Sequence, residues 1–375
     1  MTLSKRLYPP AVIGIIGGGQ LGKMLAQSAQ RMGYKVAVLD PSEDAPARAV
    51  CHTFIHAEFS DEEALIKLSV MSDVVTYEFE NIDAHILRNL VSDYYVPQGA
   101  ETVLTLQNRT TEKNAIKASG AAVVPFENIS SGDDVKTFAD KHSYPLIVKT
   151  TTGGYDGKGQ YYLESEADLA DENIPFEDTE FIVEKYINLE REVSLTAARS
   201  AGGEITYFPL QENLHRDQIL YRTIAPARVN YFDQAKAEAE KIIDAMLFVG
   251  VFTIEFFIDK DGELYVNEIA PRPHNSAHYT IEACNISQFD AHILSVTNQP
   301  LPEVYQHKDA IMMNLLGEDL DRLDLELFDY SEWNVHLYGK SDRKPARKMG
   351  HVTILTDDID EELVKLKKNF EKESQ

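Results

Sequence analysis

The chain has 375 residues, 43% hydrophobic and 26% charged, which is typical of a globular protein long enough for about two or three domains. Its net charge at pH 7, 36 − 61 = −25, argues against a general binder of nucleic acid or anionic membranes, since both need a positive surface. Two cysteines provide no disulfide framework, and we find neither a signal-peptide pattern nor an apolar run approaching 18 residues. We therefore expect a cytoplasmic protein, and the net charge does not exclude a local basic pocket for a phosphorylated small molecule.

The first hundred residues alternate between strand and helix patterns. Short apolar runs at 11–17, 34–40 and 73–79 predict strands, and the segments 20–33 and 61–72 between them have helical periodicity. This βαβαβ order predicts a parallel sheet with ligands at the carboxyl ends of its strands.

A glycine-rich turn follows the first of these strands. It reads Gly17-x-Gly19-x-x-Gly22, and Asp40 ends the second strand 21 residues after Gly19. On its own this is the pattern of a dinucleotide-binding turn.

A second unit begins near residue 101. Residues 104–126 predict a helix, a glycine stop and a strand, and residues 133–150 predict a helix and a strand ending at Lys149. Two strand-like runs follow at 181–200, and residues 234–280 predict a helix, two strands joined by the turn DKDGE, and a polar loop. A smaller mixed segment, about 301–375, closes with a helix.

The strongest single signal is the stretch PLIVKTTTGGYDGKGQYYL. A strand delivers Lys149, and the glycine-rich segment that follows contains Lys158 and leads into another strand. Backbone N–H groups of such a loop close over phosphate oxygens, and lysines neutralise them. The alternative is a flexible turn with surface lysines.

Two acids on neighbouring strands form the second signal, in FTIEFFIDKDGELYVNEIAPRP. Glu255 lies among apolar residues, where a carboxylate is costly unless something compensates its charge. Together with Glu268 and its neighbour Asn267, it suits Mg²⁺, which shares its coordination shell with substrate phosphates. The alternative is an outward-facing acid on an edge strand.

Three further segments are less specific. The acids Glu184 and Glu192 in VEKYINLERE read either as contacts to adenine and ribose or as two exposed acids. The loop APRPHNSAH places polar donors beside the predicted metal strand. A basic cluster in this acidic chain reads either as a site for a substrate phosphate or as a solvated turn; its members are Lys340, Arg343, Lys344, Arg347 and Lys348.

Together these motifs resemble the ATP-grasp superfamily over the whole chain. Within it, GIIGGGQLGKML, TYEFENI, GGYDGKGQ and NEIAPRPHNSAHYT resemble the 5-(carboxyamino)imidazole ribonucleotide synthases of purine biosynthesis. The resemblance implies a mixed α/β and α+β fold: a Rossmann-like pre-ATP-grasp domain at 1–108, an ATP-grasp domain at 109–300 with a flap subdomain at about 120–185, and a small C-terminal domain at 301–375. It also implies a homodimer and the use of ATP, Mg²⁺ and bicarbonate to carboxylate 5-aminoimidazole ribonucleotide through carboxyphosphate, giving ADP and phosphate.

The same resemblance implies roles for individual residues. The ATP phosphates would contact Arg109, Lys149, Gly154, Tyr155, Asp156, Gly157, Lys158, Gly159 and Gln160. Adenine would contact Glu184, Lys185, Tyr186 and Ile187, the ribose Glu192, the nucleotide His215, and Mg²⁺ Glu255 and Glu268 with Asn267 alongside. The ribonucleotide would contact Gln20, Leu21, Glu78, Tyr155, Lys158, Arg272, His274, Asn275, Lys340, Arg347 and Lys348, and the catalytic group would be Tyr155, Lys158 and Arg272.

The motifs leave three other functions open. A sister ATP-grasp enzyme uses formate and glycinamide ribonucleotide, but its first loop typically has Glu where this chain has Gln20. An NAD(P)-dependent oxidoreductase would explain the glycine turn but leave the lysines and the acid pair without a role. The third is a non-catalytic nucleotide sensor. Under the leading interpretation, Asp40 is a loop or helix-capping acid, and the turn lets Gln20 and Leu21 approach the ribonucleotide.

Overall fold

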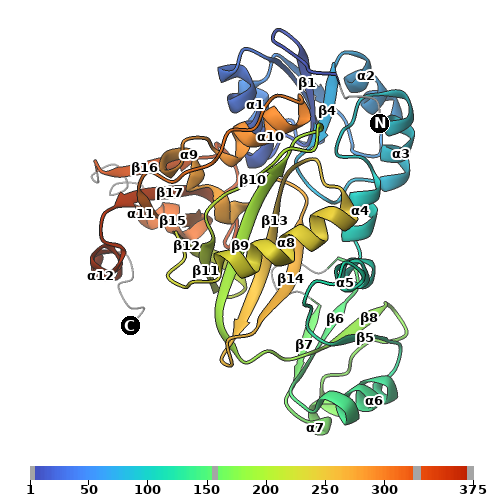
Figure 1. The fold of residues 1–375 in the computed structure, drawn as a ribbon. Coiled ribbons are helices and arrows are strands. Elements are labelled where there is room, and N and C mark those ends of the chain that lie inside the picture. The colour runs from blue at the N-terminus through green and yellow to red at the C-terminus, as the bar shows by residue number, and fades with distance from the viewer. Residues whose placement is uncertain (1–4, 154–158, 324–330, 370–375) are drawn as a thin grey trace.

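The computed structural model describes residues 5–153, 159–323 and 331–369. Within these residues the strands form three sheets, of four, nine and four strands. Figure 1 shows the first sheet at the top, the nine-stranded sheet in the middle and the third sheet at the bottom.

The N-terminal sheet is parallel, with the strand order β3-β2-β1-β4. This is the first half of a doubly wound dinucleotide-type fold. The three predicted parallel strands and the two predicted helices are confirmed, but the short edge strand β3 between them was not predicted. Asp61 begins one helix by accepting from the backbone N–H of Ala64. The elements are β1 (Val12–Ile16), α1 (Gln20–Arg31), β2 (Lys35–Asp40), η1 (Pro46–Val50), β3 (Thr53–His56), α2 (Glu62–Val70), β4 (Val74–Tyr77) and α3 (Ala84–Asp93).

The third sheet is a small antiparallel layer in the order β5-β8-β6-β7. Apolar side chains such as Phe138, Val148 and Phe181 pack between this sheet and its helices. It occupies the segment expected for the flap subdomain. Its elements are β5 (Phe126–Ile129), α6 (Gly132–His142), β6 (Leu146–Thr150), β7 (Gln160–Leu163), α7 (Glu166–Asp171) and β8 (Phe181–Lys185).

The central sheet runs in the order β14-β13-β9-β11-β12-β15-β17-β16, with β10 also paired to β9. Helix α8 packs its apolar face, which includes Ile242 and Ile243, against this sheet. The elements are β9 (Leu189–Arg199), β10 (Ile205–Tyr207), β11 (Gln211–Arg216), β12 (Ile219–Ala225), α8 (Phe232–Met246), β13 (Gly250–Asp259), β14 (Leu264–Ala270), β15 (Asp309–Leu316), β16 (Trp333–Leu337) and β17 (Lys348–Thr356).

The C-terminal segment continues this sheet. Strand β15 pairs with β12 along four residues, so the expected 301–375 unit contributes β15, β16 and β17 to the central sheet. Figure 1 shows these strands in orange and red beside β11 and β12. The basic cluster, in the connection from β16 to β17, is thereby anchored on the same sheet as the predicted metal strands.

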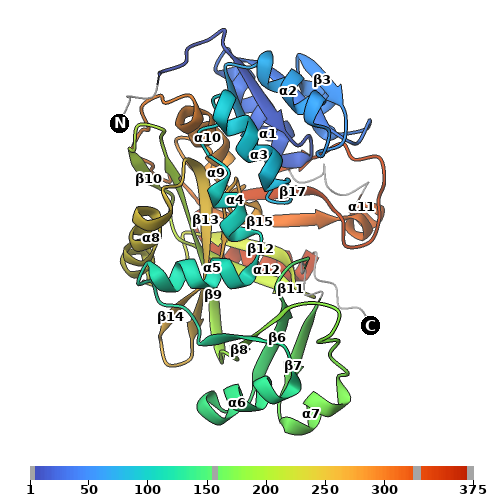
Figure 2. The ribbon, with the colours of Figure 1, turned by 90° about the vertical axis from the view of Figure 1, so that its right-hand side faces the viewer.

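The remaining helices join the layers. Helix α10 packs against both α1 and β13, and Ser28 donates to Asp290 Oδ1 at 2.6 Å. Helix α5 lies between the central sheet and the small flap sheet (Figure 2). No helix in the described part of the chain is both long and apolar enough to cross a membrane. These helices are α4 (Glu101–Leu106), α5 (Arg109–Ala118), η2 (Asn275–Ala277), α9 (Thr280–Ala283), α10 (Gln288–Val296), α11 (Gly317–Leu323) and α12 (Ile359–Asn369).

Candidate active site

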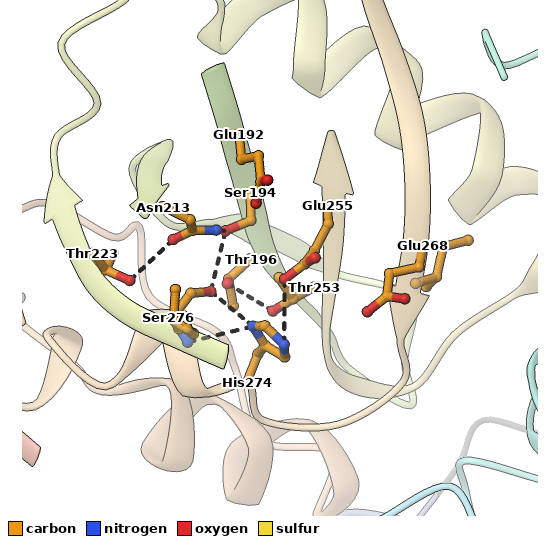
Figure 3. Close-up of polar contacts among 12 residues, drawn as sticks. Glu192, Ser194, Thr196, Asn213, Thr223, Thr253, Glu255, Glu268, His274 and Ser276 are labelled. Atoms are coloured by element: carbon orange, nitrogen blue, oxygen red, sulfur yellow. Dashed lines mark hydrogen bonds and ion pairs between the residues drawn. The ribbon is translucent and has the colours of Figure 1, made fainter. Parts of the chain in front are cut away.

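Two acidic side chains meet on neighbouring strands of the central sheet. Glu255 on β13 and Glu268 on β14 are paired in the strand register and lie side by side in Figure 3. Strand β13 is flanked by β9 and β14, so the alternative of an acid on an edge strand is wrong for Glu255. Burial, and then the charge of Glu268, raise the pKa of Glu255 to about 8. The pair is therefore electrostatically unfavourable until a positive charge joins it.

The two carboxylates suit a hard divalent cation for which the protein supplies only part of the coordination shell. Among the described residues, no three His, Cys, Asp or Glu side chains converge into a metal cage. Mg²⁺ commonly takes only one or two carboxylates from a protein and completes its shell with water and phosphate. The strand register skips Asn267, so that Asn267 and Glu268 together oppose Glu255 at this irregularity.

A buried ion-pair group lies on the side of the flap sheet. Lys149 of β6 donates from Nζ to Glu184 Oε2 of β8 at 2.9 Å. Lys113 of α5 approaches the other oxygen, with Nζ 3.5 Å from Oε1. Burial alone would raise the pKa of Glu184, but the two lysines hold it at about 2. The alternative of an exposed acid is thus wrong for Glu184. Because its carboxylate is paired with lysines, only the backbone of Glu184 is available for a contact to adenine.

This depressed pKa predicts a pH-dependent contribution to stability. A carboxylate whose pKa falls from 4.5 to about 2 on folding stabilises the folded state above pH 4.5, by roughly 3 kcal/mol. That stability should disappear as the pH drops toward about 2. In denaturant titrations, the difference in unfolding free energy between wild type and Glu184→Gln should be largest above pH 4.5 and should shrink as the pH falls toward about 2. A difference already lost near pH 4 would indicate an ordinary carboxyl group.

Arg109 connects the ion-pair group to the acid pair. It is the first residue of α5, after the N-cap Asn108, and its backbone N–H donates to Thr151 O at 2.8 Å. Its guanidinium Nη1 lies 3.8 Å from Glu268 Oε2. A cation in this position lies between the end of β6 and the acid pair, as the predicted contact to ATP phosphates requires.

The predicted glycine-rich flap is a connection between antiparallel strands. Strands β6 and β7 pair with Lys149 opposite Gln160, which confirms the strand–turn–strand prediction. At the end of the turn, Gly159 has φ +71°, and a Cβ there would lie 2.7 Å from Thr150 Oγ1. The predicted contacts Gly154, Tyr155, Asp156, Gly157 and Lys158 lie outside the described residues, so their roles stay predictions.

The expected nucleotide contacts lie where the flap sheet joins the central sheet. Strand β8 ends at Lys185, and Tyr186 and Ile187 lead into β9. Further along β9, Glu192 forms an ion pair with His215 of β11, and both side chains are about a quarter exposed. Burial would lower the pKa of His215, but Glu192 raises it above its ordinary value.

Beside Glu255, on the side away from Glu268, lies a buried layer of hydroxyl and amide side chains (Figure 3). These groups come from alternate positions of the central strands, so they face one side of the sheet. They connect to Ser276, which accepts from Gln211 Nε2 at 3.1 Å and lies 3.1 Å from Ser194 Oγ. The layer also includes Thr196, Asn213, Thr223 and Thr253.

This layer orients His274. The hydroxyl of Ser276 lies 2.8 Å from Nδ1 of His274, and the backbone N–H of Ser276 donates to the same atom at 3.4 Å. Burial keeps the pKa of His274 well below its ordinary value, so the ring is neutral. Since Nδ1 accepts, the ring proton sits on Nε2, 3.5 Å from Glu255 Oε1.

The loop after β14 carries the other expected substrate contacts. Arg272 makes a bidentate pair with Glu80, in which Nη2 donates to Oε1 at 2.8 Å and Nε donates to Oε2. The side-chain nitrogen of Asn275 is buried and has no hydrogen-bond partner among the described residues. A buried donor without a partner is costly, so it marks a place for a ligand acceptor.

The basic cluster divides into two parts. Lys340 donates to the carbonyl of Lys348 at 2.8 Å, and burial, then Arg347, lower its pKa to about 8. Glu78 is also close enough to act on Lys340, which places this lysine near the glycine turn. By contrast, Lys344 is largely exposed and pairs with Asp342 at 2.7 Å. A solvated turn therefore describes Lys344 but not Lys340.

The glycine turn itself is filled by acids of the same chain. Glu78, just beyond β4, accepts from the backbone N–H groups of Gly19 and Gly22, each at 2.6 Å. A dinucleotide pyrophosphate would occupy this helix N-terminus. Asp40 accepts from Gly18 N at 2.7 Å, so it holds the turn and does not cap a helix. This arrangement disfavours the oxidoreductase alternative.

Two expected ribonucleotide contacts lie at the start of α1. Gln20 is partly exposed there, as a ligand contact requires. The side chain of Leu21 is buried in the core between α1 and α10. Only the backbone of Leu21 is therefore left for a substrate.

Several site residues were not predicted. Gln107 donates to the carbonyls of Glu80 and Ile82 at 2.6 and 2.5 Å. Glu112 is buried and accepts from the backbone N–H of Ile269, beside Glu268, at 2.8 Å. The sequence did contain a signal for Glu112 and Lys113. They follow Arg109 by three and four residues, respectively, so they share its face of the helix.

Comparisons with known proteins agree with this geometry. Three family models match successive parts of the chain: the ribonucleotide synthetase preATP-grasp domain at 11–107, the ATP-grasp domain at 114–289 and the phosphoribosylaminoimidazole carboxylase C-terminal domain at 310–365. The N5-carboxyaminoimidazole ribonucleotide synthase of Staphylococcus aureus (strain MRSA252) is 55% identical over 352 residues, 94% of each chain. The chain belongs to this synthase family.

Solved structures of the synthase family have the same fold. The S. aureus N5-carboxyaminoimidazole synthetase complexed with ADP superposes with a TM-score of 0.94 at 54% identity, covering 96% of this chain and 97% of that one. The Aspergillus clavatus synthase in complex with ADP and 5-aminoimidazole ribonucleotide has a TM-score of 0.85 at 29% identity, over 95% and 96% of the chains. The predicted ATP-grasp fold and ligase class are thereby confirmed.

Proposed function

We propose that this chain carboxylates the 5-amino group of 5-aminoimidazole ribonucleotide with bicarbonate and ATP. The products are 5-(carboxyamino)imidazole ribonucleotide, ADP and phosphate, and the step belongs to de novo purine biosynthesis. The observation that carries the proposal is 55% identity to a synthase of this name across 94% of the chain. The acid pair and the buried lysines support it, because they suit phosphoryl transfer from a metal-bound nucleotide.

ATP lies, in this proposal, between the flap sheet and the central sheet. Lys149 and Arg109 neutralise its phosphates, the linker after Glu184 meets adenine through its backbone, and Glu192 and His215 face the ribose side. Glu255 and Glu268, with Asn267, hold Mg²⁺. The cation supplies positive charge to the phosphates when bound.

The protein's own contribution is positioning, charge and the exclusion of water. Phosphoryl transfer to bicarbonate gives carboxyphosphate, which water destroys readily, so the flap with Tyr155 and Lys158 must cover it. Arg272, held in place by Glu80, presents a fixed guanidinium toward the anionic carboxylating species. No side-chain nucleophile is needed for this reaction.

The ribonucleotide occupies the region between the glycine turn and the basic cluster. Gln20, the backbone of Leu21, and Glu78 line the turn, and Lys340, Arg347 and Lys348 receive the phosphate. The side-chain nitrogen of Asn275, which has no partner within the described part of the chain, completes the set of contacts next to Arg272 and His274. We further propose that the enzyme is a cytoplasmic homodimer.

ADP release in a coupled assay tests the function. We expect release with 5-aminoimidazole ribonucleotide plus bicarbonate, and none above background with glycinamide ribonucleotide plus formate. Release only with the formate pair would overturn the assignment.

A further inference from the structure

Three charged side chains are buried together beside the expected ATP phosphates. Lys113, Lys149 and Glu184 are 1%, 6% and 3% exposed, and they come from α5, β6 and β8. The group contains two cations and one anion, so these three side chains together carry a net charge of +1; the buried acid Glu112 also lies close enough to act on Lys113. An uncompensated buried charge is costly unless a ligand supplies its partner.

The two lysines contact Glu184 in different ways. Lys149 makes a hydrogen bond of 2.9 Å to Oε2. Lys113 Nζ stays 3.5 Å from Oε1, and neither of these two atoms has a hydrogen-bond partner among the described residues. Lys113 thus acts on Glu184 through its charge, while Lys149 is bonded to it.

The charge contact of Lys113 with Glu184 affects how strongly Lys149 can bind a phosphate. If Glu184 had only Lys149 as a partner, the pair would be neutral and an incoming phosphate would compete with the carboxylate. With Lys113 on the second oxygen, one positive charge remains in excess. Arg109, which also acts on both Lys149 and Glu184, adds to the positive field.

We propose that Lys113 is a positioning residue for the phosphate site: by offsetting the charge of Glu184, it leaves Lys149 free to bind an ATP phosphate. This inference rests on the proposed binding of ATP phosphates by Lys149. It predicts that nucleotide affinity follows the net charge of the buried group and not the presence of Lys113 itself.

Substitutions that change the net charge of the buried group, one at a time and then together, test this proposal. Lys113→Met lowers the net charge from +1 to 0, Glu184→Gln raises it to +2, and the double variant returns it to +1. We expect Lys113→Met to weaken binding of a non-hydrolysable ATP analogue with Mg²⁺ by at least about tenfold, measured by titration calorimetry on the full chain. The double variant should bind within about threefold of wild type.

Rescue by the second substitution separates the possible roles of Lys113. If the double variant binds as weakly as Lys113→Met, then Lys113 contacts the nucleotide directly or only supports the fold, and the proposal is wrong. Unchanged binding by Lys113→Met would also overturn it. The KM for 5-aminoimidazole ribonucleotide should not change in Lys113→Met. A general loss of structure would instead raise the KM values for both this substrate and ATP.

Matched variants control for folding and for surface charge. Lys117→Met, one turn further along α5 and exposed, should bind the analogue like wild type. Lys113→Gln is the second test if the methionine variant fails to fold, and Lys113→Arg should restore most of the affinity. If wild type binds the analogue but releases no ADP with the proposed substrates, the proposed function fails while this comparison of affinities still stands.

Discussion

Replacing Glu268 by glutamine should lower ADP release by at least about a thousandfold. The substitution keeps the shape of the side chain but removes one of the two carboxylates that meet across β13 and β14. Loss of charge stabilisation at a metal-assisted phosphoryl transfer costs several kcal/mol, and about 4 kcal/mol corresponds to a thousandfold in rate. Saturating concentrations of all three substrates should be used, so that the rate reports the chemical step.

The same sheet provides the control for this experiment. Glu263 is an exposed acid in the turn between β13 and β14, and Glu263→Gln should retain the wild-type rate. Thermal unfolding of both variants tests whether the strands remain intact. A Glu268→Gln enzyme with more than about a tenth of wild-type activity would contradict the metal role of the pair.

The second large effect is expected at the basic cluster. Lys340→Ala combined with Arg347→Ala should raise the KM for 5-aminoimidazole ribonucleotide by about a hundredfold or more, because each cation makes a charge-assisted contact of about 1.5–3 kcal/mol. The KM for ATP should change by less than about threefold. Initial-rate measurements with one substrate varied at a time give both constants.

Lys344 lies in the same loop and offers a matched control. Its side chain is largely exposed and pairs with Asp342. Lys344→Ala should therefore leave both KM values near those of wild type. Equal increases in both constants for the double variant would mean that the cluster is not the site of the substrate phosphate.

Local patterns were sufficient to predict the elements that carry the site. Short apolar runs identified β1, β2 and β4, and the isolated acid in TIEFF pointed to β13. The strand–glycine–strand order around Lys149 was recognised because the lysine lies at the carboxyl end of the strand, one residue before its last residue, Thr150. In each of these segments the chemistry and the element come from the same few residues.

Contacts between distant segments could not be predicted in this way. Glu184 follows an apolar run, and nothing local shows that lysines from α5 and β6 enclose its carboxylate. Gln107 looks like an ordinary helix-flanking residue until the loop at Glu80 folds against it. Likewise, the pairing of β15 with β12, which joins the basic cluster to the sheet of the predicted metal strands, depends on strands more than eighty residues apart.

The acid in the glycine turn has a consequence for evolution of the site. Glu78 is part of the same chain as the turn, so its carboxylate is present there at an effective concentration that a free ligand does not reach. A pyrophosphate would have to displace this internal competitor from Gly19 and Gly22 before it could bind the helix N-terminus. A fold suited to dinucleotides thus excludes them through one of its own side chains, and a single carboxylate directs the same backbone amides from cofactor binding to the support of the proposed ribonucleotide site.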